Sequence, residues 1–253
     1  MKGLLERQQR IKELLEKNGY VTVQDLSEEL DVTGATIRKD LRLMEEQNLL
    51  RRNHGGATEV RGKVMELPIN DRNRINTELK HRIAVAAAKL VKEDDSLAIT
   101  SGSTIEMFVR TLEGGSQLNV VTPSIRIGAI LAEKQVDVYM LGGKLNLNSL
   151  SVRDAYSMEG LRHIHCSKAI FSCDAVDIEA GVTSAYVEEA RLTAALQSIS
   201  SQNILLADST KIGKCGFGKI CDMNAVDILI TDDGISERTV QKLENIGVQV
   251  IIA

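Results

Sequence analysis

Apolar residues near the start of the chain recur at helical spacing. Over residues 4–17 they fall largely on one helical face, and Asn18-Gly19 supplies a stop that tolerates the left-handed conformation. Thr22 followed by Asp25 fits a capping box, which opens a second helix that ends near Asp31. The pattern therefore predicts two helices joined by a short turn.

The following segment predicts a third helix and a small hairpin. Thr33 can cap the helix, whose buried face comes from apolar residues at i, i+4 and i+7, namely Ile37, Leu41 and Met44. Residues 49–52 and 58–60 flank the turn at His54-Gly55-Gly56-Ala57 and are expected to form two short strands. Three helices followed by a hairpin are typical of a winged helix-turn-helix.

A different rhythm begins after a polar stretch. Residues 61–79 hold one of only two prolines and show no sustained period, which indicates an interdomain connection. The expected organisation is a winged helix-turn-helix domain over 1–60, a linker over 61–79 and a second domain over 80–253. In that second domain helical segments are predicted at 80–91, 104–112, 125–134, 186–200 and 236–245, and strands at 97–100, 118–121, 136–141, 168–173, 203–207, 228–231 and 248–251.

Strands of nearly continuous Val, Ile, Leu and Ala that alternate with helices indicate an α/β domain. Such strands are buried on both faces, so the sheet is expected to be mainly parallel, with helices on both sides. The predicted fold class is therefore α/β, with an N-terminal winged helix-turn-helix and a larger mainly parallel-sheet domain.

Composition narrows the function classes. A hydrophobic fraction of 43% suits a globular core, and a net charge of −4 excludes a global basic field, so any DNA contact must rest on local charge. No apolar run is long enough to span a bilayer and the N-terminus lacks a secretory signal, so we expect a cytoplasmic protein without a membrane partner. The four cysteines show no CxxC pair, and His163, His165 and Cys166 lack a second half of a zinc site, so neither disulfides nor a metal nor another cofactor is expected.

The third helix and the hairpin carry groups that suit DNA. Small residues let the start of a recognition helix approach base edges, while Arg and Lys reach bases or phosphates. The candidate DNA-binding residues are Thr33, Thr36, Arg38, Lys39, Arg42, Arg51, Arg52 and His54. The alternative is a merely solvated helix face, on which Asp40, Glu45 and Glu46 partly cancel the basic charge. The combination of caps, buried triplet and glycine turn favours DNA binding.

Strand ends of the second domain carry groups that suit a small anionic ligand. Backbone N–H groups and hydroxyls at a helix N-terminus form an anion site, and glycines let a ligand approach the backbone. The candidate residues are Gly102, Ser103, Thr104, Thr122, Ser124, Gly142, Gly143, Asp208 and Lys211. Each alone is ordinary turn chemistry, but four such loops at successive strand ends favour a phosphorylated small-molecule effector.

Residues 21–57 (VTVQDLSEELDVTGATIRKDLRLMEEQNLLRRNHGGA) resemble the signature of DeoR-type bacterial transcription regulators. The resemblance continues over the second domain at Lys80, Ile83, Ala84, Gly181 and Thr231-Asp232, and at several of the candidate residues above. It implies a sensor domain similar to ribose-5-phosphate isomerase and CoA-transferase folds, which answers to phosphorylated sugars or related metabolites.

Some positions depart from that family pattern. Thr100 stands where Asp is usual, Gly102-Ser103-Thr104 replaces Gly-Thr-Thr, Pro123 replaces Asn, a glycine is missing near Arg153-Asp154, and Thr193 stands where lysine is common. These changes concern the identity of the effector rather than the fold. Arg153 is a candidate to restore a cation at the effector site.

The sequence therefore predicts a regulator, and most simply a repressor of a carbohydrate-catabolism operon, that binds double-stranded operator DNA. A homodimer or higher homo-oligomer is expected, because symmetric half-sites multiply the limited specificity of one helix. An isomerase-like enzyme with a DNA-binding appendage is the alternative, with Asp174, Asp208 and Asp232 as acid-base groups. No constellation establishes that chemistry, so no catalytic residue is assigned. An architectural DNA binder leaves the second domain unexplained.

Overall fold

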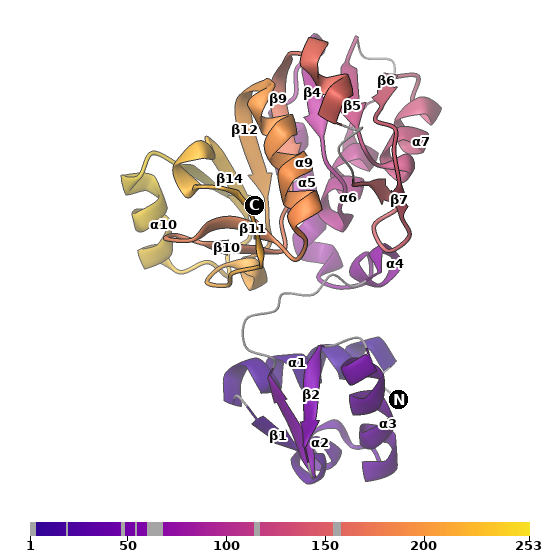
Figure 1. Cartoon of the computed structure of the whole chain (residues 1–253). Helices are drawn as coiled ribbons and strands as arrows, with labels where there is room; N and C mark the ends of the chain where they lie inside the picture. The colour runs from indigo at the N-terminus through magenta and orange to yellow at the C-terminus, as the bar shows by residue number, and fades with distance from the viewer. Residues whose placement is uncertain are drawn as a thin grey trace. The chain divides into compact units, whose positions relative to one another are not determined.

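The chain divides into two units, Met1–Met65 and Glu66–Ala253 (Figure 1). The computed structural model describes residues 4–18, 20–46, 49–53, 55–59, 68–113, 117–153 and 158–253.

The first unit holds three helices and three short strands. They are α1 (Leu4–Asn18), β1 (Tyr20–Thr22), α2 (Val23–Leu30), α3 (Gly34–Glu46), β2 (Leu50–Asn53) and β3 (Gly56–Glu59). Both predicted caps form, because Thr22 Oγ1 accepts the Asp25 N–H at 3.0 Å and Thr33 Oγ1 accepts the Thr36 N–H at 3.3 Å. The predicted buried triplet of α3 joins one core with α1 and α2. The winged helix-turn-helix is thus confirmed.

The wing contains a strand that the sequence pattern missed. β1 pairs antiparallel with β3, which gives the order β1-β3-β2. Gly55 has a φ of +95°, and a Cβ on Gly56 would lie 2.1 Å from the Val21 carbonyl oxygen, so both positions require glycine. The Val23 N–H donates to the Gly55 carbonyl at 2.8 Å. The turn of the wing is therefore tied to the start of α2.

A seven-stranded sheet of order β15-β14-β12-β9-β4-β5-β6 forms the second unit, and its described pairings are all parallel. The strands are β4 (Ser96–Ile99), β5 (Asn119–Thr122), β6 (Asp137–Met140), β9 (Cys166–Phe171), β12 (Ser200–Leu206), β14 (Ile228–Thr231) and β15 (Gln249–Ile252). The predicted parallel sheet is confirmed.

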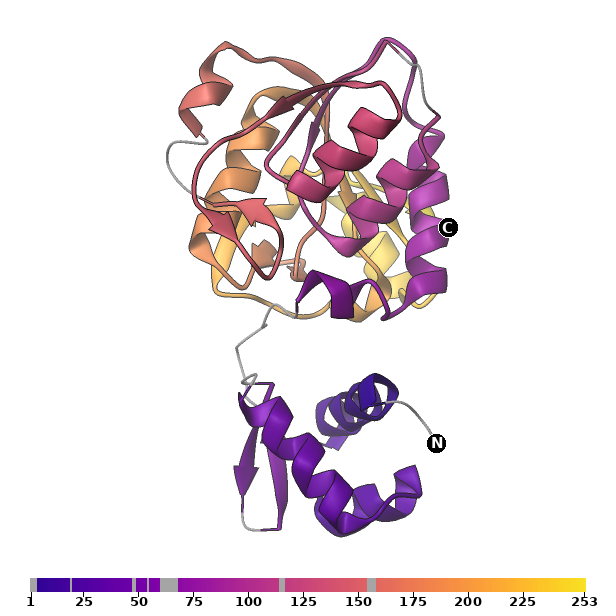
Figure 2. The same cartoon turned by 90° about the vertical axis from the view of Figure 1, so that its right-hand side faces the viewer.

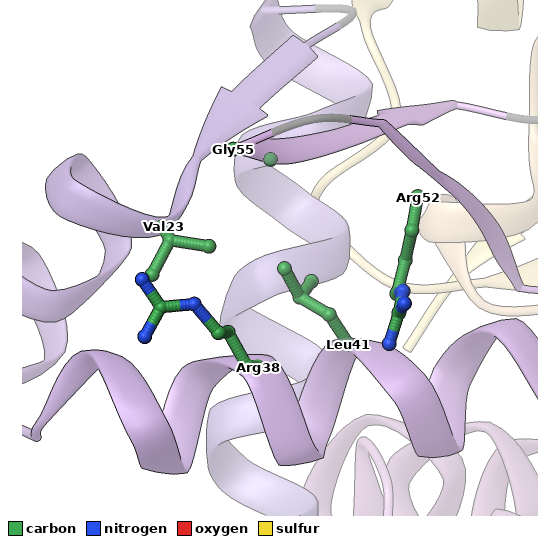
Figure 3. Close-up of a pocket in the computed structure, with 6 residues that line it drawn as sticks. Val23, Arg38, Leu41, Arg52 and Gly55 are labelled. Atoms are coloured by element: carbon green, nitrogen blue, oxygen red, sulfur yellow. The ribbon is translucent and has the colours of Figure 1, made fainter.

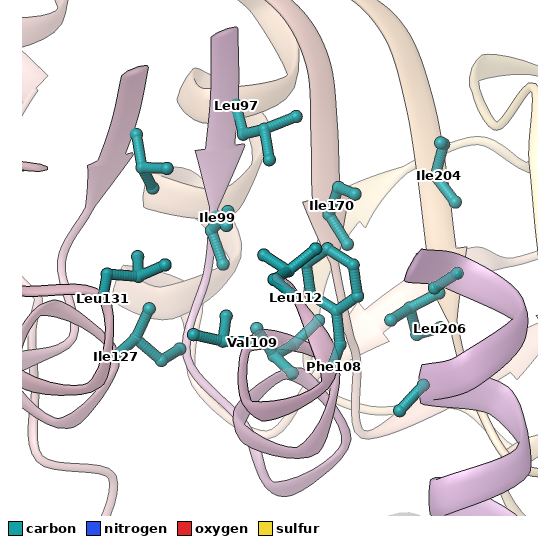
Figure 4. Close-up of a cluster of buried hydrophobic side chains, with 14 of the residues drawn as sticks. Leu97, Ile99, Phe108, Val109, Leu112, Ile127, Leu131, Ile170, Ile204 and Leu206 are labelled. Carbon is teal, nitrogen blue, oxygen red and sulfur yellow. The ribbon is translucent and has the colours of Figure 1, made fainter. Parts of the chain in front are cut away.

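Helices cover both faces of this sheet (Figures 1 and 2). One face packs on α5 (Thr77–Ala88), α6 (Ser103–Thr111) and α7 (Ile125–Glu133), and the other on α9 (Val187–Ser198) and α10 (Glu237–Asn245). Figure 4 shows the first of these layers, where Phe108 and Val109 of α6 lie against Ile99 and Ile170 of the sheet. The alternation of the two faces along each strand explains the continuous apolar runs in the sequence.

Smaller elements were not predicted. Strands β10 (Ala175–Asp177), β11 (Gly181–Ser184) and β13 (Gly218–Cys221) form an antiparallel sheet, and β7 (Leu145–Asn146) pairs with β8 (Ser151–Val152) as a hairpin. Three short 3-10 helices are η1 (Gly160–His163), η2 (Ser209–Lys211) and η3 (Met223–Ala225). These short strands mix apolar residues with polar residues and glycine, so they lack the nearly continuous apolar run that marks the strands of the main sheet.

Of the predicted connection over 61–79, residues 61–67 lie outside the described residues, and residues 68–79 form part of the second unit. Helix α4 (Ile69–Arg72) and the start of α5 fall inside this range and belong to the second unit. Ile69 is buried, and Asn70, Asn73 and Asn76 contact the rest of the second unit through their polar side chains. One buried apolar residue makes no apolar period, which is why the sequence pattern indicated a linker.

Candidate functional site

The candidate recognition surface of the first unit lies on α3. Arg38, Lys39 and Arg42 are exposed, and Thr33 and Thr36 stand at the helix start with their hydroxyls 3.0 Å apart. Neither Arg38 nor Lys39 forms an ion pair with any residue that the structure describes. The first turn of α3 carries no acidic residue, so its N-terminus favours an approaching phosphate.

Asp40 does not offset this basic surface, contrary to the sequence-based interpretation. Its side chain is buried on the opposite side of α3, where Arg7 Nε of α1 donates to Oδ2 at 2.8 Å and Arg7 Nη2 donates to Oδ1 at 3.3 Å. The pair joins α1 to the recognition helix across 33 residues of sequence. Asp40 stands three residues after Ile37 and four before Met44, so it lies on the buried face of α3. The identity of its partner could not be predicted from sequence, because Arg7 is 33 residues away.

A cavity of about 130 Å³ lies between α3 and the wing. In Figure 3 the Arg38 side chain reaches toward Val23, and Arg52 extends from the wing toward α3. Arg52 is not an isolated cation, because its Nε lies 3.1 Å from Glu45 Oε2 and its backbone N–H donates to Glu45 Oε1 at 2.9 Å. The Arg51 side chain and His54 lie outside the described residues.

The candidate effector loops follow strands of the parallel sheet, so they share its carboxyl edge. After β4 the chain passes through α6 to β5, which lies on the β6 side of the sheet. After β9 it passes through α9 to β12, which lies on the β15 side. The sequence of connections therefore reverses between β4 and β9, and ligands of open α/β sheets bind at such a switch point. The loops after β4, β9 and β12 are neighbours there.

The loop after β4 opens α6. Gly102 is the N-cap of α6, has a φ of +138° and makes no side-chain cap. A Cβ added at this position would lie 3.6 Å from the Cβ of Ser172, the residue that follows β9. Ser103 and Thr104 are buried, and Thr104 Oγ1 has no hydrogen-bond partner among the described residues. The first N–H groups of a helix have no partner within the helix, and together with a buried hydroxyl they suit an anion.

Charged groups from two elements meet beside this helix start. Lys211 Nζ donates to Ser172 Oγ at 3.2 Å and to the Cys173 carbonyl at 2.7 Å. Asp208 is 2% exposed; burial would raise its pKa, but the charge of Lys211 and hydrogen bonds from Thr210 hold it below the ordinary value. Lys80, which is 4% exposed, has its pKa lowered to about 8 by burial and by the charges of Lys211 and Arg72.

Other candidates lie farther away or serve the fold. Thr122 Oγ1 accepts the Ser124 N–H, and Ser124 Oγ caps α7 by accepting the Ile127 N–H. Gly142 and Gly143 follow β6, the edge strand. Two strands separate β6 from β9, a distance of about 14 Å at ordinary strand spacing. The structure therefore brings together Gly102 to Thr104, Asp208 and Lys211, but not the two glycines.

Arg153 belongs to a separate polar cluster. Its Nη2 lies 3.2 Å from Glu189 Oε2 and 3.2 Å from Ser149 Oγ, and its guanidinium lies 4.7 Å from the centre of the Tyr186 ring. Ser184 Oγ lies 3.0 Å from both Glu189 Oε2 and Asp174 Oδ2. Arg153 is thus already engaged by protein groups.

Sequence reasoning missed three participants. Ser172 follows β9 directly, and its position at a strand end was the available signal. Lys80 was noted only as a family match, because a lysine in an amphipathic helix is ordinarily exposed. Asn76, whose Nδ2 lies 3.5 Å from Asp208 Oδ1, fell in the presumed linker.

Within the described ranges no group of three or more His, Cys, Asp and Glu side chains is arranged to hold a metal ion. The helices that the structure describes include none with the length and apolar character needed to cross a membrane.

Comparison with protein families gives two matches that cover most of the chain. Residues 7–61 match the DeoR-like helix-turn-helix domain, and residues 75–233 match the DeoR C-terminal sensor domain. The regions agree with the two units of the structure.

Individual proteins extend this result. An HTH-type transcriptional regulator, GolR, of Listeria innocua is 31% identical over 98% of this chain and 98% of its own. A glycerol-3-phosphate regulon repressor of Haemophilus influenzae is 28% identical over 90% of this chain and 89% of its own. Among solved structures, ribose 5-phosphate isomerase A of Neisseria gonorrhoeae has a TM-score of 0.41 and 22% identity, covering 54% of each chain.

Proposed function

Since this chain belongs to the DeoR family of DNA-binding transcriptional regulators, we propose that it represses a carbohydrate-catabolism operon and is controlled by a phosphorylated sugar or a related metabolite. One observation carries the proposal. Lys211 and Asp208 lie beside the uncapped start of α6, at the switch point of a sheet in the same chain as a winged helix-turn-helix.

The DNA-binding part rests on α3. Arg38 and Lys39 reach base edges or phosphates in the major groove, while the wing adds Arg51, Arg52 and His54 beside it. Because Glu45 already pairs with Arg52, that arginine chiefly positions the wing. The protein acts as a homodimer or higher homo-oligomer, so that two recognition helices meet two half-sites.

The effector part combines an anion site with hydroxyl-binding groups. The N–H groups at the start of α6 and the Lys211 ammonium receive the phosphate, and Asp208 accepts hydroxyl groups. The name of the glycerol-3-phosphate regulon repressor supports an effector of this class.

Binding rather than turnover is the expected chemistry. The three carboxylates considered as acid-base groups are already hydrogen-bonded: Asp174 to Ser184 and the Ala185 N–H, Asp208 to Thr210, and Asp232 to Ser209 and the Gly234 N–H. A general base must reach a substrate proton. Asp174 and Asp232 bind groups of neighbouring loops, and Asp208 is proposed to accept effector hydroxyl groups rather than to abstract a proton.

The test is a DNA-binding titration of the full chain with DNA from around its own gene, at physiological salt. One compound from a panel of sugar phosphates should change the DNA affinity, whereas its unphosphorylated sugar should not. Arg38→Ala should weaken specific binding by about 1–3 kcal/mol if Arg38 contacts a base. Lys89→Ala, an exposed lysine of the sensor unit, controls for the loss of one charge.

Three results would oppose the proposal. Equal DNA affinity of Arg38→Ala and Lys89→Ala would remove the role of Arg38. A panel without effect on DNA binding would remove the phosphorylated effector. Turnover of a sugar phosphate would favour the isomerase-like enzyme.

A further inference from the structure

Residues 68–76, which we name the strap, lie along the candidate effector site. The Ile69 N–H donates to the Asn148 carbonyl of the β7–β8 hairpin at 2.7 Å, and Arg126 of α7 donates to Asn70 Oδ1 at 2.7 Å. Asn73 donates to Glu106 of α6 at 3.1 Å. The strap thus contacts α6, α7 and the hairpin through these hydrogen bonds, while the side chain of Ile69 is buried.

The far end of the strap reaches the charged groups of the site. Asn76, in the left-handed conformation with φ 51°, precedes α5, and its Nδ2 lies 3.5 Å from Asp208 Oδ1. Lys80 Nζ donates to the Arg72 carbonyl at 2.6 Å and to the Ile75 carbonyl at 2.7 Å. One buried ammonium therefore holds two carbonyls of the strap.

The same ammonium lies within electrostatic reach of the candidate site. Asn76 at the end of the strap contacts Asp208, and the charges of Asp208 and Lys211 both act on the pKa of Lys80. A dianion bound beside Lys211 attracts the Lys80 ammonium in this low-dielectric setting and competes with the Arg72 and Ile75 carbonyls for its protons. Occupation of the site then weakens the bonds that hold the strap.

The strap is also continuous with the chain that leads to the wing, because residues 60–67 join β3 to Pro68. Building on the proposed function, we propose that Lys80 is a positioning residue that couples a phosphate-bearing effector to DNA binding, by releasing or re-seating the strap of residues 68–76. An effector can shift DNA affinity only if it favours one of two states, and the strap has contacts that differ between them.

The first experiment compares amide hydrogen exchange in the full wild-type chain with and without glycerol 3-phosphate, ribose 5-phosphate, fructose 1-phosphate and inorganic phosphate. Binding of a compound, measured by calorimetry, should change exchange in residues 69–76 as well as at the start of α6. Binding that alters α6 but leaves the strap unchanged overturns the inference.

The second experiment measures the ratio of DNA affinities with and without the bound compound. For the wild type this ratio is expected within the usual 5–150-fold range of allosteric coupling, and Lys80→Met and Asn73→Ala should reduce it to below about 3-fold. Asn73→Ala removes a strap contact without touching Lys211 or Asp208, so the compound should still bind. Lys242→Met and Asn245→Ala, both exposed on α10, are matched controls that keep the wild-type ratio.

The outcomes separate the inference from the proposed function. A wild type that responds, with variants that respond equally, overturns the role of Lys80 and the strap but leaves the repressor proposal intact. A wild type that binds no panel compound overturns both. If Lys80→Met fails to fold, Asn73→Ala and the exchange data on the wild type still decide.

Discussion

At the scale of single residues, two buried charges organise the two units. Asp40 in the first and Lys80 in the second are each less than 5% exposed, although both belong to residue types that are almost never buried without a partner. Each is engaged by polar groups of another segment. A buried charge with its partners adds little net stability, but removing a partner is costly because the charge is then left buried without compensation.

Asp40→Asn should destabilise the first unit. Loss of the carboxylate leaves the Arg7 guanidinium without its buried counter-charge, which costs about 3 kcal/mol. Amide exchange of α1 and α3 in the full chain should then accelerate. Asp25→Asn, at an exposed aspartate of α2, is the control, and equal exchange in the two variants would show that the pair is dispensable.

Lys80 should give the sensor unit a distinct pH dependence. Burial lowers the Lys80 pKa from 10.5 to about 8, so between these values the unfolded chain binds more protons than the folded one. The free energy of unfolding therefore rises with pH through this window, by about 3 kcal/mol at most. Below pH 8 both states are protonated and the cost of burying the charge is constant.

The Lys80→Met variant lacks the pH-dependent free energy that comes from protonation of Lys80. Urea unfolding at pH 7 to 10 should show the wild type gaining stability relative to Lys80→Met as the pH rises. Lys242→Met should follow the wild type, since that lysine is exposed on α10. A pH-independent difference between wild type and Lys80→Met would mean that Lys80 acts only through its two hydrogen bonds.

At the scale of elements, the wing depends on close backbone contact at Gly56. A methyl group there would overlap the Val21 carbonyl oxygen, so Gly56→Ala should separate β1 from β3. The expected cost is on the order of 1–3 kcal/mol, with weaker DNA binding as a consequence. Gly160→Ala is a matched control, because its new Cβ would meet only Leu141 at 3.8 Å. Unchanged exchange in β1 and β3 would contradict the argument.

Elements defined by local contacts were predicted from the sequence, whereas elements held by long-range contacts were not. Thr22 and Thr33 were found because a cap acts on an N–H within three residues, and the strands of the main sheet because their apolar pattern is local. The strap escaped prediction because its contacts join Asn73 to Glu106 and Asn76 to Asp208, pairs that are 33 and 132 residues apart. Polar bonds of that range leave no periodic signal.

The candidate site shows the same division. Gly102 to Thr104, Asp208 and Lys211 were predicted from strand ends, and the parallel sheet places them on one edge. The order of the strands was not predictable from the alternation of elements alone. Consequently Gly142 and Gly143 were expected beside them, although β6 lies at the edge of the sheet.

At the scale of the whole molecule, the two units have separate cores and one chain of residues joins them. The effect of an effector on DNA binding is then described by a coupling free energy between the effector-binding and DNA-binding equilibria. This coupling is reciprocal. If an effector changes the affinity for DNA by a given factor, DNA must change the affinity for the effector by the same factor.

We therefore expect saturating operator DNA to weaken binding of the inducing sugar phosphate by the same factor by which the sugar phosphate weakens DNA binding. The factor should lie between about 5 and 150, or 1–3 kcal/mol. Calorimetric titration of the compound into free protein and into the protein–DNA complex measures it, with non-operator DNA as control. Equal affinity in both titrations would mean that the compound acts on DNA binding without occupying a linked site, which would exclude Lys80 and the strap as the coupling element.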